Sequence, residues 1–341
     1  MQRTTLTLLA LAVLLVSPMQ GQSMLNPLNW FDGSEKDIIA MKTASPADEA
    51  AAAKMLEDGK ARLGAGSTGA ANRIFKRMIK NYPNAKATAE ARFLHGQILM
   101  TSGRWVKAFD AYQELLQTHP GYENFDRVIG AQFECATALM EGARGRILWI
   151  LPGFRQYSKA IQQFEQIVRN APYNDYAPLA LMNMAIVAEQ QNRPEDALDA
   201  LDRLINYYPQ SMLASDAYFN MAETYANLVK GADYDQGSTR QAISYYEDFL
   251  ILFPQSSSIG EAEANLQSME NLLASSRLNL GDFYYNYRAN NTAALVFYNE
   301  TITIAPESES AAEARLRIAD IEAGVRPTSG ATILRKLLLA D

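Results

Sequence analysis

Residues Arg240 to Ser256 read RQAISYYEDFLILFPQS, and their pattern predicts the fold. Within this stretch, Ala242 precedes Pro254 by twelve residues and Tyr246 precedes the same proline by eight. A proline ends a helix because it lacks the backbone N–H and its ring clashes with the preceding turn. A small side chain lets a second helix approach closely, and a large one fills the space toward the next helix. The stretch therefore predicts a helix that packs against neighbours and ends just before Pro254.

The same spacing recurs six times along the chain. The prolines are Pro83, Pro120, Pro172, Pro209, Pro254 and Pro306, and the alanines twelve residues before them are Ala71, Ala108, Ala160, Ala197, Ala242 and Ala294. The large residues at the second position are Phe75, Tyr112, Phe164, Leu201, Tyr246 and Tyr298. This is the spacing of the tetratricopeptide repeat (TPR), in which each repeat is a helical hairpin. It predicts an all-α, TPR-like right-handed superhelix (solenoid) of about five to six helical hairpins, with these alanines and prolines at its packing positions.

The intervals between prolines predict three insertions. Successive prolines lie 37, 52, 37, 45 and 52 residues apart, whereas a plain repeat has about 34. An insertion near residues 141–156 lengthens one hairpin, a polar loop occupies 230–239, and an extra helical stretch occupies about 262–287. These insertions distinguish the chain from a plain repeat array.

The first residues read as an export signal, predicted over 1–23. Arg3 precedes an apolar run from Leu6 to Val16, which is too short to span a bilayer because that takes about 20 residues. Small residues favour cleavage after Gly21 or after Ser23, and an uncleaved anchor is the alternative. We therefore expect the mature protein outside the cytoplasm.

The remaining boundaries follow from composition. Residues 24–48 contain helix breakers such as Asn26-Pro27 and predict a leader that runs along the first repeat. The repeat domain then covers 49–323. The tail 324–341 contains an apolar, basic segment and is a candidate capping helix, because a terminal repeat must cover an otherwise exposed face.

Composition argues against several classes of function. The chain has 341 residues, of which 48% are hydrophobic, and its 31 Lys and Arg against 38 Asp and Glu give a net charge of −7. An acidic chain lacks the positive field that attracts nucleic acid. One cysteine, Cys135, and two histidines, His95 and His119, are too few for a Cys/His zinc site and form no catalytic triad by spacing. We expect no catalytic residues, no bound metal and no cofactor.

Residues from about 207 to 318 go beyond a generic repeat and resemble the BamD family of periplasmic TPR lipoproteins. The likeness lies in the polar loop followed by Arg240 to Ser256, and in Leu280-Gly281-Asp282-Phe283-Tyr284-Tyr285 leading to Pro306-Glu307-Ser308. The long interval between Pro254 and Pro306 is also similar. This chain departs from the family in having six proline phases rather than five repeats, and no cysteine directly after the signal. We therefore do not expect it to be lipidated.

The resemblance implies a non-catalytic subunit in the periplasm, at the inner face of the outer membrane, that helps assemble and insert β-barrel proteins. Its implied partners are an Omp85-type (BamA-type) barrel protein, other subunits of the assembly machine and unfolded outer-membrane protein segments, with membrane association only through those partners. In this family the C-terminal repeats would contact the barrel component, and the N-terminal ones could receive substrate. The alternative is a periplasmic TPR adaptor of a Tol-Pal or cell-division type system.

Two groups of residues are candidates for partner binding. The first surrounds a tyrosine-rich run and comprises Asp282, Tyr284, Tyr285, Tyr287 and Arg288, in which helical spacing turns Tyr284 and Tyr287 to one side. The second is a basic, aromatic patch in the first insertion, made of Arg144, Arg146 and Trp149. Ordinary packing within the repeats, or within the insertion, is the alternative for both groups.

Overall fold

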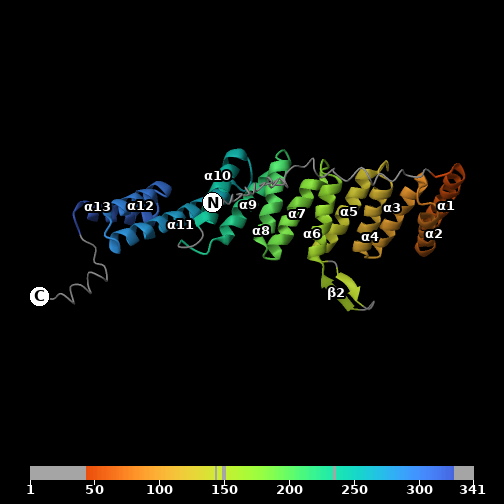
Figure 1. Ribbon diagram of the computed structural model, residues 1–341, viewed down its shortest axis with the longest axis horizontal. Coiled ribbons are helices and arrows are strands. Elements are labelled where there is room, and N and C mark those ends of the chain that lie inside the picture. Colours follow the sequence, from red (N-terminus) through yellow and green to blue (C-terminus); the bar gives the residue numbers. More distant parts are fainter. Residues whose placement is uncertain (1–43, 143, 148–150, 233–235, 326–341) are drawn as a thin grey trace, which may run out of the picture. The chain divides into compact units, whose positions relative to one another are not determined.

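The computed structural model describes residues 44–142, 144–147, 151–232 and 236–325. In this part of the chain it has thirteen helices and one pair of strands (Figure 1). The helices are α1 (Pro46–Gly64), α2 (Thr68–Asn81), α3 (Lys86–Thr101), α4 (Trp105–Thr118), α5 (Phe125–Met140), α6 (Tyr157–Asn170), α7 (Tyr176–Gln190), α8 (Pro194–Tyr207), α9 (Ala214–Leu228), α10 (Gln236–Leu252), α11 (Ile259–Asn286), α12 (Asn291–Ile304) and α13 (Glu309–Glu322). The strands β1 (Arg144–Ile147) and β2 (Leu151–Arg155) pair antiparallel between α5 and α6.

The helices form successive hairpins that stack on one another. Within the described residues, α1–α2 through α11–α12 make six hairpins, and α13 follows as a single helix. Each helix packs against the next in the chain, and the first helices of the N-terminal hairpins also touch, as α1 touches α3 and α5 touches α7. Contacts that run from each hairpin to the next define a solenoid. The structure therefore confirms the all-α, TPR-like fold.

The recurring alanines lie where neighbouring helices approach most closely. All six are fully buried, and the large residues four positions later are at most 1% exposed. Three of the large rings lie directly against a glycine of the partner helix, in the pairs Gly59–Phe75, Gly96–Tyr112 and Gly281–Tyr298. A Cβ on any of these glycines would overlap the ring. Small residues thus set the distance between the two helices, and the rings fill the space that remains.

Every repeat proline lies two residues beyond the end of a helix. The helices concerned are the second members of the six hairpins: α2, α4, α6, α8, α10 and α12. The residue between helix and proline leaves the helical conformation, as Tyr82 does at φ −129°, ψ 54° and Ala305 at φ −138°, ψ 79°. Steric clash with the proline ring disfavours the helical region for that residue. Each proline therefore turns the chain toward the next hairpin.

The insertions differ in detail from the sequence-based expectations. The first contains the β1–β2 pair, which the all-α class did not include. The polar loop expected over 230–239 is shorter, because α10 already begins at Gln236 and Thr239 is 3% exposed within it. The third insertion, expected as an extra helical stretch over about 262–287, is part of one continuous helix, α11. Its 28 residues pack against both α10 and α12.

The boundaries of the array also shift slightly. Helix α1 begins at Pro46, so it includes the last three residues of the expected leader, because the Ser45 side chain accepts a hydrogen bond from the backbone N–H of Asp48 and caps the helix. The rest of the leader, the export signal and most of the C-terminal tail lie outside the described residues. Helix α13 ends at Glu322, next to the expected end of the repeat domain.

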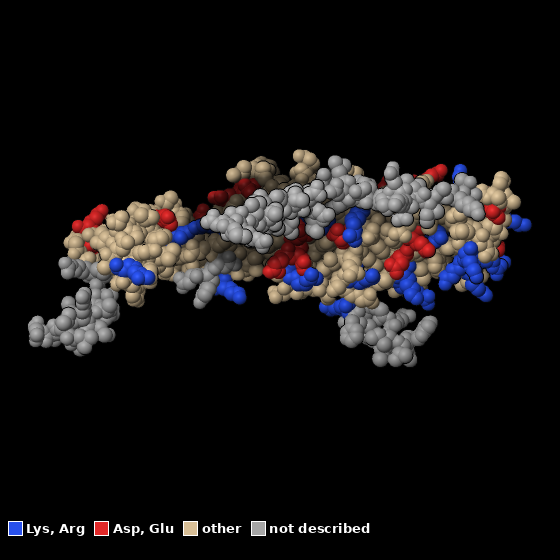
Figure 2. Space-filling view, viewed as in Figure 1, with Lys and Arg blue, Asp and Glu red and all other residues tan. Residues whose placement is uncertain are grey.

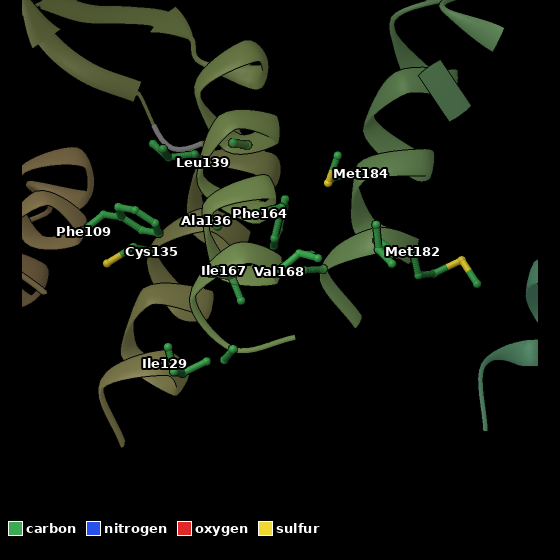
Figure 3. Close-up of a cluster of buried hydrophobic side chains, with 14 of the residues drawn as sticks. Phe109, Ile129, Cys135, Ala136, Leu139, Phe164, Ile167, Val168, Met182 and Met184 are labelled. Atoms are coloured by element: carbon green, nitrogen blue, oxygen red, sulfur yellow. The ribbon is translucent and has the colours of Figure 1, made fainter. Parts of the chain in front are cut away.

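The largest hydrophobic core runs from α3 to α9, and Figure 3 shows its central part. There Phe109 of α4, Cys135 and Leu139 of α5 and Phe164 of α6 pack together. Cys135 is fully buried, and burial raises the pKa of its thiol to about 12. It is a small core residue, as its spacing in the sequence indicates.

Candidate interaction surfaces

Asp282 lies between the last helices and ties them together. Its Oδ1 accepts a hydrogen bond of 2.7 Å from the Tyr298 hydroxyl of α12 and one of 3.2 Å from Nε of Arg317 in α13. Burial raises the pKa of Tyr298, and the bond to Asp282 adds to that effect. Arg317 also donates to Glu313 at 2.8 Å. Asp282 therefore serves the packing of α11, α12 and α13.

Tyr284 and Tyr285 also hold this part of the structure together. Tyr285 is 4% exposed, and its hydroxyl donates to the backbone carbonyl of Val325 at 2.8 Å. The Tyr284 ring stacks on Phe297 of α12 with 5.3 Å between ring centroids and 12° between planes. Both rings therefore pack against other residues of the chain, and Tyr284 remains half-buried.

An exposed aromatic cluster remains at the end of α11, made of Phe283, Tyr287 and Arg288. Tyr287 is 74% exposed and Phe283 42%. Their rings stack at 5.9 Å, and the Arg288 guanidinium lies 5.4 Å from the centroid of Phe283. We call these three residues the α11 aromatic cluster.

The ring beside Tyr287 is thus Phe283, one helical turn earlier, and not Tyr284. Phe283 lies in the same run of the sequence but is not among the residues proposed there for partner binding. Its i, i+4 spacing to Tyr287 is the signal that identifies it. Rigid rings beside a cation are typical of the residues that contribute most to protein interfaces.

The second candidate group lies in the β1–β2 insertion. Arg144 and Arg146 are in β1, where Arg144 pairs with Arg155 of β2, and Trp149 lies outside the described residues. Arg155 donates from Nη1 to the Tyr157 hydroxyl at 2.9 Å. The structure therefore places the two arginines on one strand and does not bring them together with the α11 aromatic cluster.

Neither a membrane-spanning helix nor a metal-binding cluster is found among the described residues. In the part of the chain that the structure describes, no helix combines the length and apolar character needed to cross a bilayer, and the longest one, α11, carries Glu261, Glu263 and Arg277. Among those same residues, no three acidic, His or Cys side chains lie close enough together to hold a metal ion.

The stacked hairpins make this chain a tetratricopeptide-repeat protein, and a TPR sequence model matches residues 56–123, from α1 to just beyond α4. A second match identifies the family. The model of the YfiO family, described as outer membrane lipoprotein, matches residues 153–323, from β2 to the end of α13. This is 171 of the 341 residues, and the chain belongs to that family.

Individual relatives agree with the family. The chain is 26% identical over 171 residues to the outer membrane protein assembly factor BamD of Rickettsia prowazekii. The alignment covers 50% of this chain and 68% of that protein. It is 22% identical over 128 residues to BamD of Caulobacter vibrioides, and this alignment covers 38% of this chain and 42% of that protein. The chain thus spans less than half of the second relative. These matches confirm the resemblance to the BamD family.

The structure is also similar to a solved one. A tetratricopeptide repeat protein from Parabacteroides merdae aligns over 77% of this chain and 96% of its own length, with 14% identity and a TM-score of 0.33.

Proposed function

We propose that this chain is a non-catalytic scaffold that assists the assembly and insertion of β-barrel proteins into the outer membrane, acting in the periplasm at the inner face of that membrane. The observation that carries the proposal is the family match from β2 to α13, which includes the long α11 and its aromatic cluster. Both relatives described above are named as outer membrane protein assembly factors. A solenoid supports this role because its stacked hairpins present an extended surface for partners.

In this proposal the α11 aromatic cluster docks an Omp85-type barrel protein. Phe283 and Tyr287 bury a large area at a small entropy cost because each ring has few rotatable bonds. Arg288 beside them provides hydrogen-bond donors for a carboxylate or carbonyl of the partner. Other assembly subunits and unfolded outer-membrane protein segments would bind elsewhere along the array, and association with the membrane would come through these partners.

Depletion of the protein tests the assembly role. We expect lower levels of outer-membrane β-barrel proteins and an envelope stress response, and complementation with the unaltered chain should restore both. The F283A/Y287A variant should complement poorly. The matched control is Tyr173→Ala, which removes a ring that is 95% exposed between α6 and α7, and it should complement fully. Unchanged barrel levels on depletion would refute the assembly role.

Crosslinked affinity purification from intact envelopes tests the partner. An Omp85-type protein should be recovered with the unaltered chain and with Tyr173→Ala, and lost with F283A/Y287A. Recovery of Tol-Pal or division proteins without a barrel protein would instead support the adaptor function.

A further inference from the structure

Charge is distributed unevenly along the hairpins. Residues 44–122, which form α1 to α4, carry 11 Lys and Arg against 7 Asp and Glu, whereas residues 176–325 carry 8 against 21. Figure 2 shows Lys and Arg side chains gathered over the α1–α4 hairpins. A basic region in a chain of net charge −7 is a local feature that its overall composition hides.

One face of α2 consists of exposed cations. These are Arg73, Lys76, Arg77 and Lys80, whose spacing of three, four and seven residues places them on the same side of a helix. The opposite side packs Ala71, Phe75 and Met78 into the core. None of the four cations forms a salt bridge with another described residue, and the first turn of α2 has no acidic residue. Their charge is therefore available to a partner.

This face borders a groove between α2 and α4 with α3 at its base. The groove encloses about 540 Å³, and its lining includes Lys76 of α2, His95 of α3, and Arg104 and Lys107 at the start of α4. Helix α4 also has no acidic residue in its first turn, so its positive N-terminal end adds to the potential of the two cations beside it.

The carboxylates in the groove do not cancel this charge. Asp110 and Glu114 also line it. The Glu114 carboxylate lies 3.0 Å from Nη1 of Arg92, whose side chain is 6% exposed, so this carboxylate is paired with a buried cation. Asp110 remains against the three lining cations. The groove is therefore positive overall.

Neutral groups in the groove supply hydrogen bonds. Burial, with the charge of Lys76, lowers the pKa of His95 to about 4, so the ring is neutral at ordinary pH. Its Nδ1 donates to Asn72 Oδ1 at 2.6 Å, which leaves Nε2 as an acceptor. Gln117 adds an amide group on α4, whereas the Gln113 amide is already bonded to Gln132 and Asn170. Such groups suit the backbone N–H and C=O of a peptide.

The groove fits a peptide better than a lipid surface. Every large hydrophobic side chain that is exposed among the described residues lies at Tyr173 or beyond, and none lies in α1 to α4. Helices that lie on membranes insert an apolar face, but the apolar face of α2 is already buried in the core. A concave groove also follows an extended chain more closely than a plane.

We propose that the α2–α4 groove binds an acidic segment of a partner protein, with carboxylates of that segment against Lys76, Arg104, Lys107 and the basic face of α2. This proposal does not depend on the assembly role, because it rests on the charges and shape of the N-terminal hairpins. It is tested on purified protein, so either proposal can fail without the other.

Fluorescence anisotropy with a labelled deca-glutamate peptide is the test, and a neutral Gly-Ser peptide is the blank. Binding should weaken steeply as salt is raised, because the Debye length falls to about 3 Å at 1 M. The K76E/R104E/K107E variant should bind about tenfold more weakly or worse, since three exposed ion pairs of ordinary strength together give about that factor. The matched control, K54E/K230E/R240E, makes the same change in net charge at exposed sites outside the groove and should bind as the unaltered chain does.

Several results would overturn the proposal. One is that the peptide does not bind, and another is that both triple variants lose binding equally. A third is that the chain binds phosphatidylglycerol vesicles but not the peptide, and that the K76E/R104E/K107E variant loses this vesicle binding. A fourth is that the groove variant abolishes only self-association of the chain in sedimentation at low salt. If the charge reversals prevent folding, K76Q/R104Q/K107Q removes the same charges with smaller local repulsion and must give the same loss of peptide binding.

Discussion

Replacing Gly281 with alanine tests the close packing of α11 on α12. A Cβ at this position would lie 2.5 Å from Cε1 and 2.6 Å from Cδ1 of Tyr298. Carbon atoms of different residues pack at about 3.5–4.0 Å, so the ring or one of the helices must move by about 1 Å. The ring has nowhere to go, because it is fully buried and its hydroxyl is bonded to Asp282.

Two opposed effects set the size of the change in stability. Overpacking a close-packed core costs about 1–3 kcal/mol. Alanine in place of glycine inside a helix contributes about 1 kcal/mol in the other direction. Because the Tyr298 ring is fully buried and bonded to Asp282, we expect overpacking to dominate, with a net loss of up to about 2 kcal/mol. For a chain of this size a loss of 1 kcal/mol lowers the melting temperature by about 1.5–2 °C, because the unfolding entropy grows with length.

Urea unfolding and hydrogen exchange of the α11–α13 amides measure this effect, and the same helix provides a control. Gly260 has no atom within 4 Å of a Cβ built on it, so Gly260→Ala should be neutral or stabilising by up to about 1 kcal/mol. In a Tyr298→Leu background the overlap is gone, so Gly281→Ala should lose its penalty there. The reasoning would be refuted if Gly281→Ala behaved like Gly260→Ala, or if its penalty persisted without the ring.

Other substitutions test the packing, a titrating group and an ion pair. Ala242→Leu should lower the free energy of unfolding by about 1–3 kcal/mol in urea, because the alanine is fully buried, while the exposed Gln241→Leu should change it little. The melting temperature should fall as pH drops from about 6.5 toward 4, because the pKa of His95 is about 4 in the folded chain and 6.5 in the unfolded chain. Over this range protonation of His95 stabilises the unfolded chain more than the folded one, and the pH dependence should be weaker in His95→Gln. Arg203→Lys should lower stability by about 1 kcal/mol, because lysine cannot reproduce the two hydrogen bonds, of 2.8 and 3.4 Å, that the arginine donates to Glu165; equal urea midpoints would contradict this.

The repeat positions could be predicted because each depends on neighbours in the chain. A proline ends its own helix through local geometry, and the alanine and the ring are separated by four residues, which is one helical turn. The helical pattern on either side of the first insertion does not predict the β1–β2 pair within it. The start of α10 differs from the prediction for another reason. Gln236 to Thr239 are polar residues typical of a loop, yet Thr239 is buried in the fold.

The interaction surfaces were only partly predictable. Tyr284, Tyr285 and Tyr287 are equivalent by composition, but Tyr285 is buried with its hydroxyl on Val325, and Tyr287 is exposed. The difference depends on where α12 and α13 pack, and no local spacing reports that. The same holds for the α2–α4 groove, since its cations come from two helices that are separated in sequence by the whole of α3.

The spacing of alanines, rings and prolines along the chain is enough to predict an array of helical hairpins, because it follows the helix repeat. The segments 240–256 and 280–285 carry the resemblance to the BamD family. Which of these side chains remain at the surface depends on how the helices pack in three dimensions. In the folded chain Asp282 packs between helices, Phe283 is exposed, and Lys76 lines a groove. Burial and electrostatic potential at each residue depend on which helices lie nearby in space.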